Sequence, residues 1–227
     1  MKRLIIASML FTASYASAQG QTRSATTEIT KSSSLYSLPS PEVNGHSTSV
    51  TEALRTRHSV RSFSSTPLTD QQLSNLCWAA FGMTRDNNHR TAPTAMNRQE
   101  IRLFVFNATG VYEYMAKDNL LDKLADGDKR SLVAGEEGRR QAFVLDAPVS
   151  LVLVIDFDIF GKKDKQAMMM GCVDAGNVSE NINLYCQSVG LATVPRATMD
   201  TEGIRKLLGL NENQLPIINN PVGIEKK

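Results

Sequence analysis

The chain has 227 residues, 41% of them hydrophobic, which suits one globular domain with a substantial core or at most two small ones. The formal net charge is +2 and the isoelectric point is about 8.4. A charge this small does not predict a nucleic-acid-binding protein, because such proteins usually carry a strongly basic stripe.

The N-terminus has the charge and hydropathy order of a secretory signal peptide. Lys2 and Arg3 precede an apolar run, and residues 16–18 (Ala-Ser-Ala) form a small-residue cleavage site. The apolar run is too short for a permanent membrane anchor, and Gln19 after the cut cannot carry a lipid as Cys can. We expect residues 1–18 to be a signal peptide and the protein to be exported, in a bacterium to the periplasm. The alternative is an ordinary buried helix.

Three cysteines, Cys77, Cys172 and Cys186, are expected to be structural thiols. An odd number does not make a complete disulfide framework. If Cys172 and Cys186 lie on one helix, they are about 21 Å apart, which a disulfide cannot span. No CxxC or His-rich spacing predicts a metal site.

The first predicted element follows a polar segment. Residues 19–48 are rich in Ser and Thr, which predicts a flexible leader ahead of a domain at 49–227. Residues 49–52 (Ser-Val-Thr-Glu) form a capping-box pattern that predicts a short helix to about Arg57. The apolar residues of 58–63 alternate with polar ones, so extended backbone is expected there.

The next elements are a helix and a hairpin. A capping-box pattern at 69–72 predicts a helix with an apolar face, which Gly82 can close. Residues 83–97 lack periodicity and are expected to form a loop. Segments 101–107 and 111–115 flank Ala-Thr-Gly and predict a hairpin.

The C-terminal half mixes helices and strands. Residues 117–143 are charged and predict a solvated, helical excursion, and 147–156 contain an unbroken apolar run typical of a strand buried on both faces. Helices are expected at 174–191 and from Asp200 to Gly209, and a last strand at 215–224. Because strands and helices do not alternate strictly, the sequence favours an α+β fold.

The sequence RTRHSVR at residues 55–61 concentrates positive charge in a nearly neutral chain. In an extended segment Arg57, Ser59 and Arg61 share one face. Two guanidiniums and a hydroxyl can surround a phosphate, since the planar fork of arginine matches its oxygens. The alternative is a solvated basic cluster that stabilises the helix C-terminus.

A second polar cluster, APTAMNRQ, lies at residues 92–99. Asn97 and Gln99 each carry donors and acceptors, a combination that can bind the edge of a heterocycle. The alternative is a turn whose side chains bond to their own backbone.

Several catalytic motifs are missing from the sequence. It contains no GxSxG, GxxxxGK[ST], HExxH or GxGxxG, and no visible Ser/His/Asp set. If the protein is an enzyme, its reactive group is therefore expected to come from a cofactor.

These segments, in this order, resemble the FMN-dependent nitroreductase family over about residues 49–227. The matching segments are RHSVR at 57–61, PTAMNRQ at 93–99, APVSLVLV at 147–154, DAGNVSENINL at 174–184, GL at 190–191, VP at 194–195 and PVG at 221–223. WAAFG, RTAPTA and GVYEY resemble the branch associated with thiazole- and oxazole-forming oxidases. The resemblance implies an α+β fold with a mainly antiparallel central sheet flanked by helices, and an intertwined homodimer with FMN at the subunit interface.

The resemblance also implies roles for the basic cluster. Arg57 and Ser59 would bind the phosphate or ribityl chain of FMN, with His58 beside them. Arg61 would lie near the pyrimidine edge of the flavin and stabilise its reduced, anionic form. Lys226 or Lys227 would complete the phosphate site.

Two further segments would contact the flavin ring. The residues expected to reach it, from the partner subunit, are Pro93, Thr94, Ala95, Asn97 and Gln99. Ala197 and Thr198 would pass near flavin N5. Thr94 and Thr198 depart from the family pattern, which usually has Ser and often Gly there, and the long C-terminal arm of some relatives is not expected.

The activity implied is a ping-pong transfer of hydride or electrons through flavin N5 to a small organic substrate, which is nitroaromatic, quinone-like or heterocyclic. No side chain need act as a nucleophile. Nicotinamide donors belong to the cytoplasm, so export leaves the reductant open: a quinol, a partner protein, or the substrate of an oxidase. The alternatives from other classes are a non-catalytic flavin- or ligand-binding protein and an exported hydrolase.

Overall fold

The computed structural model describes residues 35–43, 45, 47–85 and 88–226 of the chain. The predicted signal peptide, the first part of the predicted leader (19–34) and Lys227 lie outside these residues. Within the described residues, no helix has both the length and the apolar character that a membrane crossing needs.

Strands and helices follow one another in mixed order along the chain. The strands are β1 (Leu35–Ser37), β2 (Phe63–Ser64), β3 (Met83–Arg85), β4 (His89–Arg90), β5 (Ile101–Asn107), β6 (Gly110–Met115), β7 (Leu120–Asp126), β8 (Val149–Asp156), β9 (Ala192–Thr193) and β10 (Gln214–Glu225). The helices are α1 (Val50–Thr56), α2 (Asp70–Phe81), α3 (Arg130–Ala134), α4 (Phe157–Phe160), α5 (Lys165–Ser188) and α6 (Thr201–Leu208), with short 3-10 turns η1 (Ala95–Asn97) and η2 (Ala142–Leu145).

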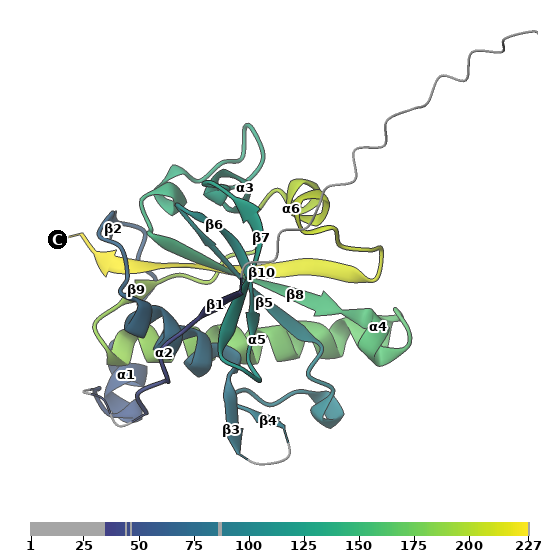
Figure 1. Ribbon diagram of the computed structural model, residues 1–227, viewed down its shortest axis with the longest axis horizontal. Helices are drawn as coiled ribbons and strands as arrows, with labels where there is room; N and C mark the ends of the chain where they lie inside the picture. The colour runs from purple at the N-terminus through teal and green to yellow at the C-terminus, as the bar shows by residue number, and fades with distance from the viewer. Residues whose placement is uncertain (1–34, 44, 46, 86–87, 227) are drawn as a thin grey trace, which may run out of the picture. The chain divides into compact units, whose positions relative to one another are not determined.

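One large sheet organises these elements (Figure 1). Its strands lie in the order β1-β7-β6-β5-β8-β10-β2, with β9 beside β10, and β3 and β4 form a separate small hairpin. The pairings between these described strands are antiparallel. The expected α+β architecture with a mainly antiparallel sheet is confirmed.

Strand β8 separates two hydrophobic cores, and all eight of its residues are buried. Because side chains alternate along a strand, Leu151 and Leu153 face the core under α2 and α5, whereas Val152 and Val154 face the core under α3 and α6. Figure 1 shows these helix pairs on opposite sides of the sheet. Burial on both faces explains the unbroken apolar run of this strand.

The predicted leader is wrong for its described part, because the domain already includes residues 35–43. Tyr36 of β1 lies opposite Leu121 of β7, and Leu38 is buried in the core with 8% of its surface exposed. The Ser74 hydroxyl on α2 donates to the carbonyl of Pro39 at 2.5 Å. A short edge strand gains its order from backbone pairing with a distant strand, which composition does not reveal.

The solvated helical excursion predicted for 117–143 is also wrong. The segment contains strand β7, which pairs along its length with β6, and the short helix α3. Val133 and Ala134 are fully buried in the second core. Most of the exposed charged residues of this segment lie in the turns before and after β7 and after α3, and this polar composition masked the strand.

Other predicted elements are confirmed. Both N-caps form: Ser49 accepts from the Glu52 N–H, and Thr69 and Gln72 make a complete capping box. The hairpin β5–β6 has the expected strands, whereas α5 starts earlier than predicted, at the N-cap Asp164. The aperiodic segment before β5 is irregular apart from a small hairpin and η1.

The three cysteines are free thiols, as predicted. Burial raises the pKa of Cys77 and Cys186 well above the ordinary thiol value. These thiols are therefore inert parts of the core.

Candidate functional site

The arginine segment leaves α1 in an extended conformation. Arg57 is the C-cap, with φ −57° and ψ 135°, and its N–H donates to the Ala53 carbonyl at 2.8 Å. Val60 is buried and donates its N–H to Thr193 of β9 at 3.1 Å. The buried Val60 thus fixes the segment to the domain. The side chains that are predicted to bind the ligand remain exposed to solvent.

The predicted binding residues of this segment share that exposed side of the chain. Arg57, His58, Ser59 and Arg61 are all exposed. His58 Nδ1 lies 3.1 Å from the Thr56 carbonyl, and its Nε2 is 3.9 Å from the Glu225 carboxylate. A narrow hollow beside Arg57 and His58 is also lined by Asn183 and Gln187 of α5.

The C-terminal strand ends beside the same segment. Glu225 of β10 lies opposite Phe63 of β2, and the Lys226 N–H donates to the Ser62 carbonyl at 3.1 Å. The structure therefore brings the predicted phosphate ligand Lys226 next to Arg61, although the two are far apart in sequence.

Arg196 is a site residue that the sequence analysis did not identify. It is buried, with 8% of its surface exposed. Its guanidinium donates to Gln141 Oε1 at 2.9 Å and to Asn219 Oδ1 at 2.7 Å. It also donates to the last two carbonyls of α3, on Val133 at 3.1 Å and Ala134 at 3.3 Å. All four acceptors are neutral oxygens.

Among the described residues, no carboxylate forms an ion pair with Arg196. Burial and the nearby charge of Arg61 lower the pKa of Arg196 to about 10. A buried cation beside a second cation is costly unless an anion lies close to both. The arrangement favours an anionic ligand in contact with this part of the surface.

Ala197 and Thr198 follow directly and are held in place through Asn219. The backbones of Arg196 and Asn219 exchange hydrogen bonds at 2.8 and 2.7 Å, and Asn219 Nδ2 donates to the Thr198 carbonyl at 3.1 Å. A cavity of about 380 Å³ opens beside Ala197 and Thr198, and Glu136 and Arg139 line its other side. The predicted N5 segment thus borders a space large enough for a small molecule.

The predicted ring-binding loop is built by strained backbone and one buried carboxylate. Met96, Asn97 and Gln99 have φ of 53°, 52° and 56°, the left-handed region that non-glycine residues rarely adopt. The Ala95 N–H donates to Asp174 Oδ2 on α5 at 2.7 Å. Strain of this kind persists where the surroundings fix it, and it is common at ligand sites.

The amide of Gln99 is fully occupied within the loop. Its Oε1 accepts from Arg90 Nε at 2.8 Å and from Asn88 Nδ2 at 3.2 Å. Its Nε2 donates to Asn97 Oδ1 at 3.0 Å and to the Asn88 carbonyl. Within a single chain, the Gln99 side chain therefore bonds to its own loop, which is the alternative given above for this segment. Pro93 and Asn97 are exposed, and Thr94 and Ala95 half-buried; contact of this loop with flavin stays a prediction.

The structure does not bring the two predicted clusters together within one chain. Asp174 lies under the loop, and Cys186 lies under the arginine segment beside Arg57. Both belong to the straight helix α5, where a separation of 12 residues corresponds to about 18 Å. A ligand that used both clusters on one ring system would need the loop of a second copy.

A buried acid pair supports the loop and was also missed. Glu100 has no exposed surface and Asp174 has 4%. Neither oxygen of Glu100 accepts a hydrogen bond from a described N–H or O–H group. Burial, followed by the neighbouring Asp174 carboxyl, raises the pKa of Glu100 to about 7. Burial thus favours the protonated, neutral form of Glu100.

Comparison with known proteins decides the family. The sequence profile of the nitroreductase family matches residues 54–223. The chain belongs to the nitroreductase family. The predicted resemblance is thus confirmed, and with it the nitroreductase-like fold; members of this family typically bind a flavin.

Individual relatives of this nitroreductase-family protein agree. A candidate nitroreductase of Methanocaldococcus jannaschii is 28% identical over 185 residues, which is 76% of this chain and 89% of the relative. The crystal structure of a candidate nitroreductase from Ralstonia eutropha is 29% identical with a TM-score of 0.77, over 85% of this chain and 90% of that one.

More distant structures are similar in fold alone. The microcin synthetase McbBCD complex of E. coli is 17% identical with a TM-score of 0.64, over 97% of this chain and 79% of that one. The NADPH:FMN oxidoreductase of Vibrio harveyi is 21% identical with a TM-score of 0.59, over 78% and 69%.

Proposed function

We propose that this nitroreductase-family protein is an FMN-dependent oxidoreductase that acts as a homodimer, passing hydride or electrons between two small substrates in turn. The observation that carries the proposal is the buried guanidinium of Arg196, which has only neutral hydrogen-bond partners. It lies near Arg61 and directly before the segment that borders a cavity. A site of this charge fits a group that becomes negative when it is reduced.

The residues present fit FMN along its length. Arg57, Ser59 and Lys226 would hold its phosphate, because their side chains are exposed and belong to segments tied together at Ser62. Arg61 and Arg196 would place positive charge near the ring. Bound FMN would supply hydride transfer, a chemistry that the side chains themselves do not offer.

The partner subunit would supply the loop at 93–99. The separation along α5 supports this, because one chain keeps the loop away from its own arginine segment. Its strained backbone is already fixed by Asp174 before any partner arrives, which lowers the ordering cost of binding.

The cavity beside Ala197 and Thr198 is the proposed substrate space. Its lining combines Met199 with the charged residues Glu136 and Arg139. A small nitroaromatic, quinone-like or heterocyclic compound fits its volume of about 380 Å³. The identity of the physiological reductant depends on where the protein is located, and the proposal leaves it open.

The test of the proposed function compares FMN with riboflavin, which lacks the phosphate. The purified chain is expected to be a yellow dimer with one FMN per subunit, bleached by dithionite and recoloured by p-benzoquinone. Arg57→Gln is expected to weaken FMN binding by about 10-fold or more and to leave riboflavin binding unchanged. Fluorescence titration measures both.

Arg55→Gln is the matched control for that titration, because Arg55 is exposed and already paired with Glu52 at 2.6 Å. Its FMN affinity should equal that of the wild type. A colourless monomer that does not take up FMN contradicts the proposal, and esterase activity in such a protein would favour the hydrolase. Bound flavin that no acceptor reoxidises would favour a non-catalytic carrier.

Export is proposed from residues 1–18 of the sequence and is tested separately. N-terminal sequencing of the protein from a bacterial host is expected to find Gln19 first, in the periplasmic fraction. Replacing Lys2 and Arg3 with Glu should leave unprocessed chain in the cytoplasm. A wild-type chain that keeps Met1 and stays in the cytoplasm contradicts the proposal.

A further inference from the structure

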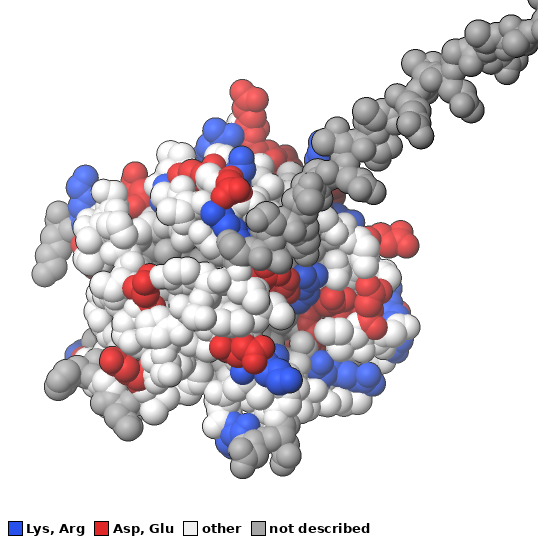
Figure 2. Space-filling view, in the orientation of Figure 1, with Lys and Arg blue, Asp and Glu red and all other residues white. Residues whose placement is uncertain are grey.

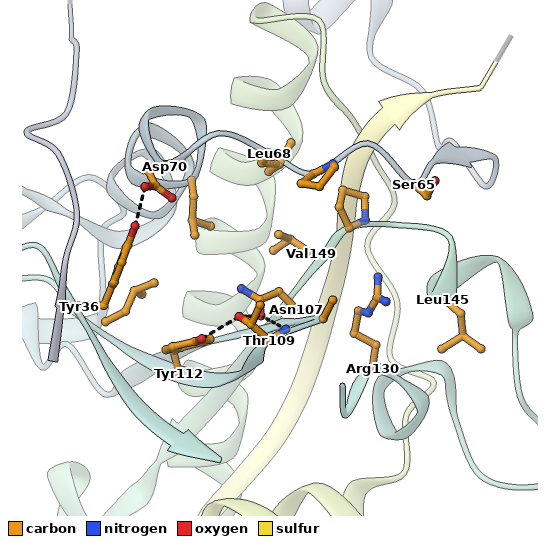
Figure 3. Close-up of a pocket in the computed structure, with 15 residues that line it drawn as sticks. Tyr36, Ser65, Leu68, Asp70, Asn107, Thr109, Tyr112, Arg130, Leu145 and Val149 are labelled. Carbon is orange, nitrogen blue, oxygen red and sulfur yellow. Dashed lines mark hydrogen bonds between the residues drawn. The ribbon is translucent and has the colours of Figure 1, made fainter. Parts of the chain in front are cut away.

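A second and larger cavity lies away from the arginine segment, at the end of the sheet where α2 begins. Its volume is about 450 Å³, within the range of small-molecule sites. It is bounded by β1, the N-terminus of α2, the β5–β6 turn and the start of β8 (Figure 3). None of the residues predicted to bind flavin lines it.

The body of this cavity is apolar. It is lined by Leu73 of α2, Leu121 of β7, Val149 of β8 and Leu68 in the loop before α2. Leu73, Leu121 and Val149 belong to the core under α2 and α5, so the cavity is an opening into a packed core. Such walls favour a flat apolar group, which releases water when it enters.

One end of the cavity is negative and aromatic. The Tyr36 hydroxyl donates to Asp70 Oδ2 at 2.5 Å, and Figure 3 shows this pair closing one end, with the Tyr112 ring along the wall. Tyr36 is 43% exposed, so its ring is at the mouth. The Asp70 carboxylate takes part in no ion pair of the described residues, and its second oxygen, Oδ1, accepts no hydrogen bond from them.

The opposite end offers no free positive charge. Arg130 lies there, and its Nε and Nη2 donate to Asp128 at 3.0 and 2.6 Å. Its Nη1 donates to the Ala147 carbonyl at 2.6 Å. Because Asp128 neutralises Arg130, the charged group of the cavity without an ion-pair partner among the described residues is Asp70, which is exposed in the first turn of α2.

From these contacts we infer that the cavity is a second ligand site, which takes an organic ammonium compound with a one- or two-ring apolar body. The ammonium group lies between the Asp70 carboxylate and the Tyr36 ring, where a carboxylate and a π face both stabilise a cation. The ring system fills the apolar body between Leu68 and Val149. This inference does not depend on the proposed flavin site.

Three probes that share a phenyl ring test the charge preference: phenethylamine, 2-phenylethanol and phenylacetate. Saturation-transfer NMR on the full chain is expected to show saturable phenethylamine binding in the millimolar range, about 3- to 10-fold tighter than 2-phenylethanol. Phenylacetate is expected to bind weakest. Equal binding of the three probes, or no binding of phenethylamine up to about 10 mM, overturns the inference.

Asp70→Asn locates the site. It is expected to bring phenethylamine binding down to the level of 2-phenylethanol, since asparagine keeps an acceptor for Tyr36 but removes the charge. Asp118→Asn, an exposed acid on the β6–β7 turn outside the cavity, should leave phenethylamine binding unchanged. An equal loss in both variants overturns the assignment to this cavity.

Added FMN separates this site from the flavin site. Saturating FMN is expected to leave the phenethylamine signal unchanged. Displacement of phenethylamine by FMN would mean that the cavity belongs to the flavin site, and it would overturn the inference of a second site. Failure of FMN to bind at all affects the proposed function alone.

Discussion

Replacing Arg196 with methionine is expected to lower the free energy of unfolding of the flavin-free chain by about 3 kcal/mol. The guanidinium donates to four oxygens, of which two are the last carbonyls of α3 and two are the side-chain oxygens of Gln141 and Asn219. Methionine fills most of the same volume without a donor, so these acceptors lose their partners. That loss exceeds the relief gained by removing a buried cation, because each unpaired buried acceptor costs about 1–3 kcal/mol.

Urea unfolding followed by the fluorescence of the single tryptophan, Trp78, measures this change. Arg205→Met is the matched control, because Arg205 also donates to two backbone carbonyls, on Gln214 and Asn211, but is only half-buried. Its expected loss is below about 1 kcal/mol. Equal losses in the two variants would contradict the special role of Arg196.

Arg196→Lys tests whether the stability depends on the positive charge or on the hydrogen bonds of the guanidinium. Lysine keeps the positive charge but lacks the planar fork that reaches several acceptors. We expect it to recover little of the lost stability. If Arg196 also supports the proposed flavin, the lysine variant should bind FMN more tightly than the methionine variant does.

Glu100→Gln is expected to make the protein more stable than the wild type at pH 8 by about 2–3 kcal/mol, with little difference at pH 5. The folded chain holds a proton on Glu100, whose pKa is raised to about 7, whereas the unfolded chain releases it near the ordinary value. The stabilising contribution is fully present below the unfolded pKa and is lost as pH rises through about 7. Glutamine stays neutral throughout, so its burial cost does not change with pH.

Thermal unfolding at pH 5, 6, 7 and 8 checks this prediction. Glu212→Gln serves as the control, because Glu212 is exposed and should leave the pH profile unchanged. Parallel profiles for the wild type and Glu100→Gln would show that the buried carboxyl does not hold the extra proton.

Local sequence signals predicted the elements whose causes are local. The capping residues Ser49 and Thr69 mark the starts of α1 and α2, and the apolar run of β8 records burial on both faces. Strand β1 was missed because an edge strand is fixed by pairing with residues far away in sequence, and β7 was missed because its charged composition indicated a solvated helix. Leu35 of β1 is 61% exposed, so the pattern of its side chains carries almost no information about its pairing.

The same difference between local and long-range causes explains which residues of the site the sequence predicted. The exposed cations of the arginine segment were found, because four charged or polar side chains gather within five positions. Arg196 and Glu100 each stand alone among ordinary neighbours, and nothing in the sequence distinguishes them from surface residues. Their burial comes from α3, β10 and α5, which only the folded chain brings to them.

The pairing of β2 with the end of β10 also fixes when the proposed phosphate end of the site can form. Ser62 and Lys226 are 164 residues apart, so the ribosome makes the second partner long after the first. A chain whose synthesis has not yet reached Lys226 therefore lacks this anchor, and any nucleotide held there must be loaded after β10 has paired with β2. For an exported chain, maturation would then depend on a flavin supply on the far side of the membrane.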